Sequence, residues 1–170
     1  MRGTKLPGVL GYRDLFVEYL ALDYVLRNLE GNGWNWKICD RFQVGYDIEA
    51  FKGKRQIRIE VKGRSVGEYS GTRYESRVQK TTPRRRFHFS KPQLERGDFF
   101  IAVFVGPFDR KSVVMSHEDL LRLMDGGDEL IVTFRLDSNL DFVKTKKWRD
   151  GKEMDITPFI EGWDRLEAKY

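Results

Sequence analysis

Residues 46–63 read YDIEAFKGKRQIRIEVKG. Apolar and polar residues alternate on both sides of residues 52–55, which is the pattern of two strands joined by a tight turn. A two-residue turn with glycine, here Gly53, in its first central position favours type II′. If the two ends of this turn pair, Asp47 lies opposite Glu60, whereas a three-residue turn would shift the register. We therefore predict a β-hairpin on which two carboxylates face each other.

One face of the predicted hairpin has the composition of a metal site. Two carboxylates directly opposite each other repel unless a cation lies between them. Lys62 follows Glu60 by two residues and therefore shares its face of the strand. Hard divalent cations take oxygen ligands and keep several waters, so Asp47, Glu60 and the main-chain carbonyl of Val61 predict a Mg²⁺ site. Such a metal polarises a phosphate and acidifies a water, and Lys62 is placed to orient that water or to stabilise charge on phosphorus.

A helix is predicted before the hairpin. Between Arg13 and Leu29, apolar residues recur at steps of three and four along one helical face, at Leu15, Tyr19, Leu22, Leu26 and Leu29. With this face buried, Glu18 lies at its margin. We predict that the Glu18 carboxylate reaches over the sheet edge toward the metal, and a solvent-exposed helical glutamate is the competing interpretation.

The rest of the chain alternates short strands and helices. Apolar or alternating runs predict strands at residues 85–89, 99–105, 113–115 and 129–136. Ser116-His117-Glu118-Asp119 is a capping-box sequence that predicts a helix start. Further helices are expected at residues 90–96 and 158–169. Because the sequence has no internal repeat and no linker, we expect one α/β domain over residues 1–170, with its core at residues 13–105 and an extension at residues 108–170.

Positive charge is concentrated in one stretch. The chain has a formal net charge of +5, and residues 64–91 alone hold eight basic residues against two acidic ones. Such an excess, interleaved with tyrosines, is typical of a phosphate-binding surface, although most charge runs only make a surface soluble. We predict that nucleic acid is bound by Arg64, Arg73, Tyr74, Arg77, Lys80, Arg84, Arg85 and Arg86.

Composition excludes several classes of protein. Of the 170 residues, 40% are hydrophobic and 34% are charged, so the chain is neither disordered nor fibrous. No apolar run approaches the roughly 18 to 20 residues that span a bilayer, and residues 1–8 lack the apolar core of a signal peptide. Cys39 is the single cysteine, so neither an internal disulfide nor a cysteine-based zinc site is expected. We expect a cytoplasmic protein with no membrane partner.

The ordered set of these residues resembles a known superfamily. A helix with Glu18, a strand with Asp47 and then the run Ile59-Glu60-Val61-Lys62-Gly63 resemble the PD-(D/E)xK nucleases. Within that superfamily the pattern is similar to archaeal Holliday-junction resolvases and Mrr-type restriction endonucleases. The resemblance covers residues 13–105. It departs from the motif at Tyr46, where the motif has proline, and in the long basic insertion at residues 64–86.

The resemblance implies a restriction endonuclease-like core, with a central mixed sheet flanked by helices, and Mg²⁺- or Mn²⁺-dependent hydrolysis of DNA. By that motif, Asp47 and Glu60 match the metal ligands, Lys62 the catalytic lysine and Glu18 the carboxylate of the first helix. We therefore expect an endonuclease that cuts double-stranded or branched DNA. Cutting both strands needs two sites, which a homodimer would supply, but the sequence does not decide the oligomeric state.

Three alternatives stay open. The same residues fit a nuclease directed at RNA or at single strands. A non-catalytic nucleic-acid-binding module on a nuclease-like scaffold would keep the fold without the reaction, and Glu60 and Lys62 would then lie on the solvated side of an ordinary strand. The third alternative is a structural subunit whose segment after Phe108 docks another protein.

Overall fold

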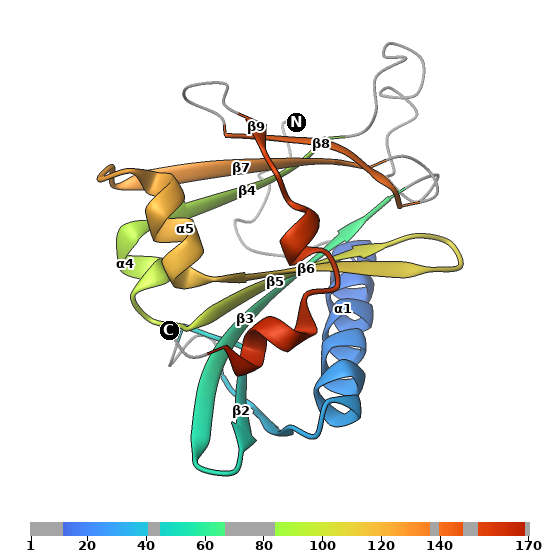
Figure 1. Ribbon diagram of the computed structural model, residues 1–170. Coiled ribbons are helices and arrows are strands. Elements are labelled where there is room, and N and C mark those ends of the chain that lie inside the picture. Colours follow the sequence, from blue (N-terminus) through green and yellow to red (C-terminus); the bar gives the residue numbers. More distant parts are fainter. Residues whose placement is uncertain (1–11, 41–44, 67–83, 137–139, 148–152, 169–170) are drawn as a thin grey trace, which may run out of the picture.

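The structure, a computed structural model, describes residues 12–40, 45–66, 84–136, 140–147 and 153–168. They form three layers (Figure 1): a long helix α1 (Tyr12–Gly31), a five-stranded sheet called sheet A, and a four-stranded sheet called sheet B. Helix α1 covers one face of sheet A and sheet B covers the other. Sheet A therefore lies between two hydrophobic cores.

Sheet A is a mixed sheet. Its strands lie in the order β1 (Asn35–Ile38), β2 (Ile48–Lys52), β3 (Arg55–Ser65), β5 (Phe99–Val105) and β6 (Arg110–Ser116). Strands β3 and β5 run parallel, and the other neighbouring strands run antiparallel. The fold class is therefore α/β with a central mixed sheet, as the sequence predicts. Among the described residues, no helix is long and apolar enough to cross a membrane.

The β2–β3 hairpin has the predicted register and turn. Lys52 pairs with Arg55, and the ladder continues in step to the pair of Ile48 and Ile59. In the turn, Gly53 has a φ of 60° whereas Lys54 keeps a negative φ. This combination fits a type II′ turn, because a type I′ turn needs positive φ at both positions. The alternation of apolar residues and the turn chemistry thus agree on one register.

Helix α1 buries a different face from the predicted one. Its buried side is formed by Ala21, Val25 and Leu29, which follow one another at steps of four residues. Leu15 and Tyr19, by contrast, are 54% and 65% exposed. The prediction was therefore wrong about which side of the first half of the helix meets the sheet, although the helix itself and its length are confirmed.

The reason for this rotation lies at Gly63 on β3. A Cβ atom built on Gly63 would come within 2.8 Å of the Val17 carbonyl oxygen and 3.0 Å of the Ala21 Cβ. Helix and strand approach so closely that only small side chains fit between them, which selects the alanine side of α1. Glu18 precedes Ala21 by three residues and consequently lies on the side that faces the sheet.

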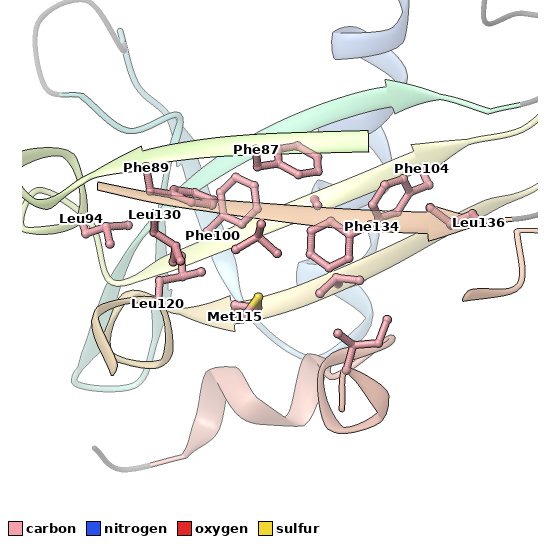
Figure 2. Packing of buried hydrophobic residues seen from close by; sticks show 14 of the residues in the cluster. Phe87, Phe89, Leu94, Phe100, Phe104, Met115, Leu120, Leu130, Phe134 and Leu136 are labelled. Carbon is pink, nitrogen blue, oxygen red and sulfur yellow. The ribbon is translucent and has the colours of Figure 1, made fainter. Parts of the chain in front are cut away.

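Sheet B was only partly predicted. Its strands lie in the order β4 (Arg84–Ser90), β7 (Glu129–Leu136), β8 (Phe142–Lys147) and β9 (Glu153–Met154), and all neighbours are antiparallel. It packs on sheet A through aromatic rings (Figure 2). Phe87 of sheet B meets Phe100 and Phe104 of sheet A edge to face, and Phe134 of sheet B meets Phe104, with ring centroids 5.3 to 6.2 Å apart. Strands β4 and β7 match predicted strands, whereas β8 and β9 were not foreseen.

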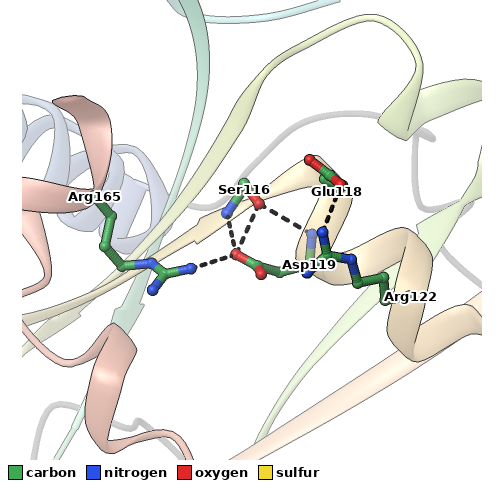
Figure 3. Close-up of polar contacts among 5 residues, drawn as sticks. All are labelled: Ser116, Glu118, Asp119, Arg122 and Arg165. Carbon is green, nitrogen blue, oxygen red and sulfur yellow. Dashed lines mark hydrogen bonds and ion pairs between the residues drawn. The ribbon is translucent and has the colours of Figure 1, made fainter. Parts of the chain in front are cut away.

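Two short helices lie where the sheets meet: α4 (Lys91–Leu94) and α5 (His117–Met124). The capping box of α5 is confirmed (Figure 3), because the Ser116 hydroxyl accepts from the Asp119 amide while the Asp119 carboxylate accepts from the Ser116 amide. Arg165 adds a hydrogen bond of 2.8 Å to the same carboxylate. The end of the described chain is thereby fastened to α5.

The helix predicted at residues 158–169 is wrong in type. Two short 3-10 helices, η1 (Thr157–Phe159) and η2 (Trp163–Glu167), stand there instead. Between them Glu161 takes a φ of 49°. Its carboxylate accepts hydrogen bonds from Ser112, from Trp163 and from Tyr24 of α1. These tertiary contacts hold a left-handed residue in place, and a continuous α-helix cannot pass through it.

We predict that Gly63→Ala lowers the free energy of unfolding by about 1–3 kcal/mol, because the new methyl group has to push α1 away from β3. Gly31→Ala is the matched control, since a Cβ at that helix residue meets nothing within 4 Å. It should change stability by less than about 1 kcal/mol and in the stabilising direction. Urea unfolding of the three proteins measures both values. Equal stability of Gly63→Ala and wild type would contradict the close approach.

Candidate active site

The predicted catalytic residues of β3 lie on the face of sheet A that looks away from α1. Ile59 and Val61 belong to the core under α1, so Glu60 and Lys62 point to the opposite side, where sheet B begins. The Glu60 side chain is 8% exposed and that of Lys62 is 28% exposed. Glu60 is thus a nearly buried carboxylate, and a buried carboxylate requires partners.

Glu60 has two partners in the structure. The Lys62 ammonium lies 3.4 Å from one of its oxygens. The side-chain amide of Gln93, on helix α4, donates to both carboxylate oxygens at 2.9 and 3.2 Å. Sequence reasoning missed Gln93, because it lies far along the chain on a separate short helix and no local pattern distinguishes it. Only the packing of α4 beside β3 brings it to Glu60.

Asp47 lies directly before β2, where the regular ladder with β3 ends. Its own amide donates to the Ile59 carbonyl at 2.9 Å, and its carboxylate accepts a hydrogen bond of 2.7 Å from the Val61 amide. The Val61 amide lies between Glu60 and Lys62 in the chain. Asp47 is thereby held against the segment that carries both other residues, close to the position predicted from the hairpin register.

Glu18, on α1, lies beside a later part of β3 than predicted. Its ion pair in the described structure is with Arg64, at 4.0 Å, two residues beyond Lys62. The Arg64 guanidinium also lies over the ring of Phe87 on β4, at 4.8 Å from its centroid. Arg64 shares the strand parity of Glu60 and Lys62, whereas Glu18 comes from α1 on the other face of sheet A, so this second charged pair joins the two sides of β3.

The chemistry of the donors fits a hard cation. Asp47 and Glu60 supply carboxylate oxygens, each with lone pairs beyond those used in the hydrogen bonds above. Mg²⁺ is commonly held by one or two carboxylates and completes its shell with water. Among the described residues, however, no group of three or more His, Cys, Asp or Glu side chains is close enough to hold a metal. The candidate ligands that remain are the Asp47 and Glu60 carboxylates and the predicted Val61 carbonyl.

An ion pair fixes the end of the site nearest the hairpin turn. The Asp98 carboxylate accepts from the Arg58 backbone amide at 2.7 Å and from its guanidinium at 3.1 Å. The Asp98 amide donates back to the Arg58 carbonyl. This hydrogen bonding raises the pKa of the Arg58 guanidinium above its ordinary value. Because Asp98 directly precedes β5, the contact sets the start of the parallel β3–β5 ladder one residue before Glu60.

His117 supports the helix that carries Gln93. Its Nδ1 lies 2.6 Å from the Leu94 carbonyl oxygen, and its ring packs against Gly97, where a Cβ would come within 2.6 Å of the ring. Burial lowers the pKa of His117, and nearby carboxylates of Glu60 and Asp98 only partly offset this. A neutral imidazole that donates from Nδ1 is therefore the form that the fold selects.

The predicted nucleic-acid-binding residues divide into three groups. Arg73, Tyr74, Arg77 and Lys80 lie outside the described residues, as does the side chain of Arg84. Arg64 and Arg85 make contacts within the fold, and the Arg85 guanidinium donates to the Ser65 carbonyl at 2.8 Å. Arg86 has an exposed side chain.

Comparisons with known proteins give two similarities. A sequence profile of the family described as Protein NO VEIN, C-terminal, matches residues 17–85, which is less than half of the chain. This stretch contains Glu18, Asp47, Glu60 and Lys62 and ends before Gln93. No curated protein matches the chain. Among solved structures, the bacterial homing endonuclease I-Ssp6803I matches with a TM-score of 0.49 and 12% sequence identity, over 89% of this chain and 91% of that one.

We predict that the stability of the protein falls as the pH drops below about 6.5, and that His117→Asn removes part of this dependence. The unfolded chain binds a proton at the ordinary imidazole pKa of about 6.5, whereas burial lowers the pKa in the folded state. The unfolded state therefore binds more protons than the folded state. The contribution of His117 to stability is fully present above about pH 6.5 and is lost as the pH falls toward the lowered pKa of the folded state.

Asparagine is chosen because its side-chain amide can replace Nδ1–H as the donor to Leu94. Urea unfolding between pH 4.5 and 8 measures the slope, and His88→Asn, which removes the other imidazole at an exposed position, is the control. Unchanged pH dependence in His117→Asn, with a changed one in His88→Asn, would refute the prediction.

Proposed function

We propose that the protein is a metal-dependent endonuclease that hydrolyses phosphodiester bonds in DNA, with Asp47, Glu60 and Lys62 as its reacting groups. One observation supports this most: the Asp47 carboxylate is bound to the Val61 amide, between Glu60 and Lys62. Two carboxylates and an ammonium are thereby gathered where β2 and β3 separate. This is the set of groups that metal-assisted phosphodiester hydrolysis uses.

In this proposal Asp47 and Glu60 would hold Mg²⁺ or Mn²⁺ through their carboxylate oxygens, with the Val61 carbonyl as a main-chain ligand. The metal, when bound, supplies Lewis acidity toward the scissile phosphate and lowers the pKa of a water. Gln93 keeps the Glu60 carboxylate in one orientation by donating to both oxygens. Preorganisation of this kind avoids a rearrangement of the carboxylate during the reaction.

Lys62 acts on the phosphate. Its side chain is more exposed than that of Glu60, and its ion pair of 3.4 Å is longer than a close charged hydrogen bond. The ammonium can therefore turn to the oxygen on which negative charge develops and stabilise it. Glu18 orients Arg64, which lies two residues beyond Lys62 and supplies a second cation for the DNA backbone.

The substrate follows from the charge around the site. The two described ends of the basic segment lie close together, since Arg64 is on the site strand β3 and Arg85 of β4 binds the Ser65 carbonyl, and their positive charge attracts a polyanion. We propose double-stranded or branched DNA as the substrate. Because cutting both strands requires two sites, the active species is then a homodimer or a monomer that binds twice.

A second candidate function is a non-catalytic nucleic-acid-binding module. It is favoured by the way Glu60 is closed off by Gln93 and Lys62, and by the lack of a group of three metal-binding side chains among the described residues. In that case the same contacts serve only to satisfy a buried carboxylate. The two functions differ in whether DNA is cut.

We predict that the protein cuts supercoiled plasmid or a four-way junction with Mg²⁺ or Mn²⁺ but not with EDTA. Asp47→Ala and Lys62→Ala should each lower the cleavage rate by at least ~100-fold, the order of effect of removing one charge-stabilising group. Glu49→Ala is the control, since Glu49 shares the strand face of Asp47 but binds Tyr46. Metal-independent DNA binding without cleavage by the wild type would instead establish the binding module.

We further predict that the stability of Gln93→Glu depends on metal, so that metal binding can be detected without measuring cleavage. A third carboxylate beside the buried Glu60 should cost about 1–3 kcal/mol of stability in EDTA, since it replaces a donor by a charge. Mn²⁺ should then raise the melting temperature of Gln93→Glu more than that of wild type, because an oxygen ligand is added.

Gln93→Met has a similar length and no charge and is the control for this experiment. It should lose stability without gaining a response to Mn²⁺. If Mn²⁺ shifts neither wild type nor Gln93→Glu, then no metal binds at Glu60.

A further inference from the structure

The outer face of sheet B, which looks away from sheet A, carries a set of basic positions. On β4, Phe87 and Phe89 are buried against sheet A, so the alternate residues Arg86 and His88 face outward and are exposed. On β7, Val132 and Phe134 are buried in the same way. Arg135 therefore takes an outward position on the neighbouring strand.

The strand register gathers these positions into two rows. Arg84 pairs with Arg135, and Arg135 pairs with Lys144 on β8. In the second row, Arg86 pairs with Thr133, and Thr133 pairs with Lys146. Five basic positions thus lie on three adjacent strands, and one row consists of like charges only. Like charges directly opposite one another repel in a sheet, so a row of this composition favours a negatively charged partner.

Protection of a sheet edge does not explain the rows. Charged residues on edge strands prevent unwanted pairing with other chains, and β4 is the edge strand of sheet B in the described structure. This accounts for arginines on β4. It does not account for Arg135, because β7 lies between β4 and β8 and has no free edge. An anionic partner that covers the face would account for all five positions.

The acidic positions of the same face lie at its margins. Glu129, at the start of β7, forms an ion pair of 3.6 Å with His88. Glu153, on the short strand β9, pairs with Lys146. Between these margins, the outward positions of β7 hold Ile131, the nearly buried Thr133 and Arg135, and their neighbours on β4 and β8 are mostly basic. The described outward positions on β4 and β7 hold no phenylalanine, tyrosine or tryptophan, which a surface that stacks unpaired bases would need.

The face is also connected to the candidate site. The Arg85 guanidinium binds the Ser65 carbonyl at the end of β3, and Arg64 lies over Phe87. Strand β4 is therefore the part of sheet B nearest to the strand that carries Glu60 and Lys62. A polymer that crosses the outer face of sheet B can reach the site around the β4 edge.

We propose that the outer face of sheet B, at the strand positions of Arg84, Arg86, Arg135, Lys144 and Lys146, binds the sugar-phosphate backbone of duplex DNA without reading its sequence. The proposal rests on the proposed function in taking DNA as the ligand, but it concerns a surface separate from Asp47, Glu60 and Lys62. Binding on this face holds the duplex while the site acts on a neighbouring part of it.

The test is the salt dependence of binding to a 30-base-pair duplex, measured in EDTA so that no cleavage is required. In Arg135→Gln/Lys144→Gln two phosphate contacts are lost. The slope of log K against log salt should become shallower by about 2, and affinity at about 0.15 M salt should fall at least ~10-fold, equally for unrelated sequences. The control Arg27→Gln/Lys54→Gln removes the same charge at exposed positions on α1 and in the hairpin turn, and it should bind like wild type.

Equal slopes and affinities for Arg135→Gln/Lys144→Gln and the control, with matching melting temperatures, would overturn the proposal even if the protein cleaves DNA. Loss of binding in this variant supports it even if no metal produces cleavage. A single-stranded oligonucleotide of the same length is the second probe. If the variant loses affinity for it as strongly as for the duplex, the assignment to duplex DNA is wrong.

Discussion

Strand β3 lies between two cores, and its register decides which side chains each core receives. Its odd-numbered residues from Ile57 to Gly63 face α1, and its even-numbered residues face sheet B and the open side of the hairpin. A shift by one residue would bury Glu60 and Lys62 under α1 and expose Ile59 and Val61. The type II′ turn at one end and the Asp98 carboxylate on the Arg58 backbone hold this register.

Burial of Glu60 follows from that arrangement and sets the character of the site. A carboxylate removed from water needs donors, and the fold supplies them from two directions, through Lys62 on the same strand and Gln93 on α4. Helix α4 in turn is held by the His117 ring on the Leu94 carbonyl. The orientation of Glu60 therefore depends on α5 as much as on the hairpin. The fold itself thus supplies the donors that the buried Glu60 carboxylate needs.

The residues after Phe108 are part of this assembly. Strand β6 completes sheet A, and β7 and β8 form sheet B with β4. The end of the chain returns to the hairpin, where the Arg55 guanidinium donates to the carbonyls of Glu167 and Ala168 at 2.7 and 2.6 Å. Because these residues form strands of both sheets, the segment after Phe108 is part of the domain and not a separate docking tail.

Features that depend on neighbours along the chain could be predicted from the sequence. Alternation and one turn glycine were enough for the hairpin register, and with it for the common face of Glu60 and Lys62. A capping box was enough for the start of α5 at Ser116. Each of these is decided within a few residues, where steric and hydrogen-bonding preferences act directly.

Features that depend on close contact between distant segments could not be predicted in this way. The approach of α1 to Gly63 turned the alanine side of the helix to the sheet and left Leu15 and Tyr19 exposed, against their hydrophobicity. Contacts of Glu161 broke the expected terminal helix. Gln93 reached Glu60 only because sheet B packs on sheet A. Sequence periodicity separates apolar from polar residues. Close packing also depends on the shape of each side chain and on its partner in another layer, and the partner is fixed only when the layers pack together.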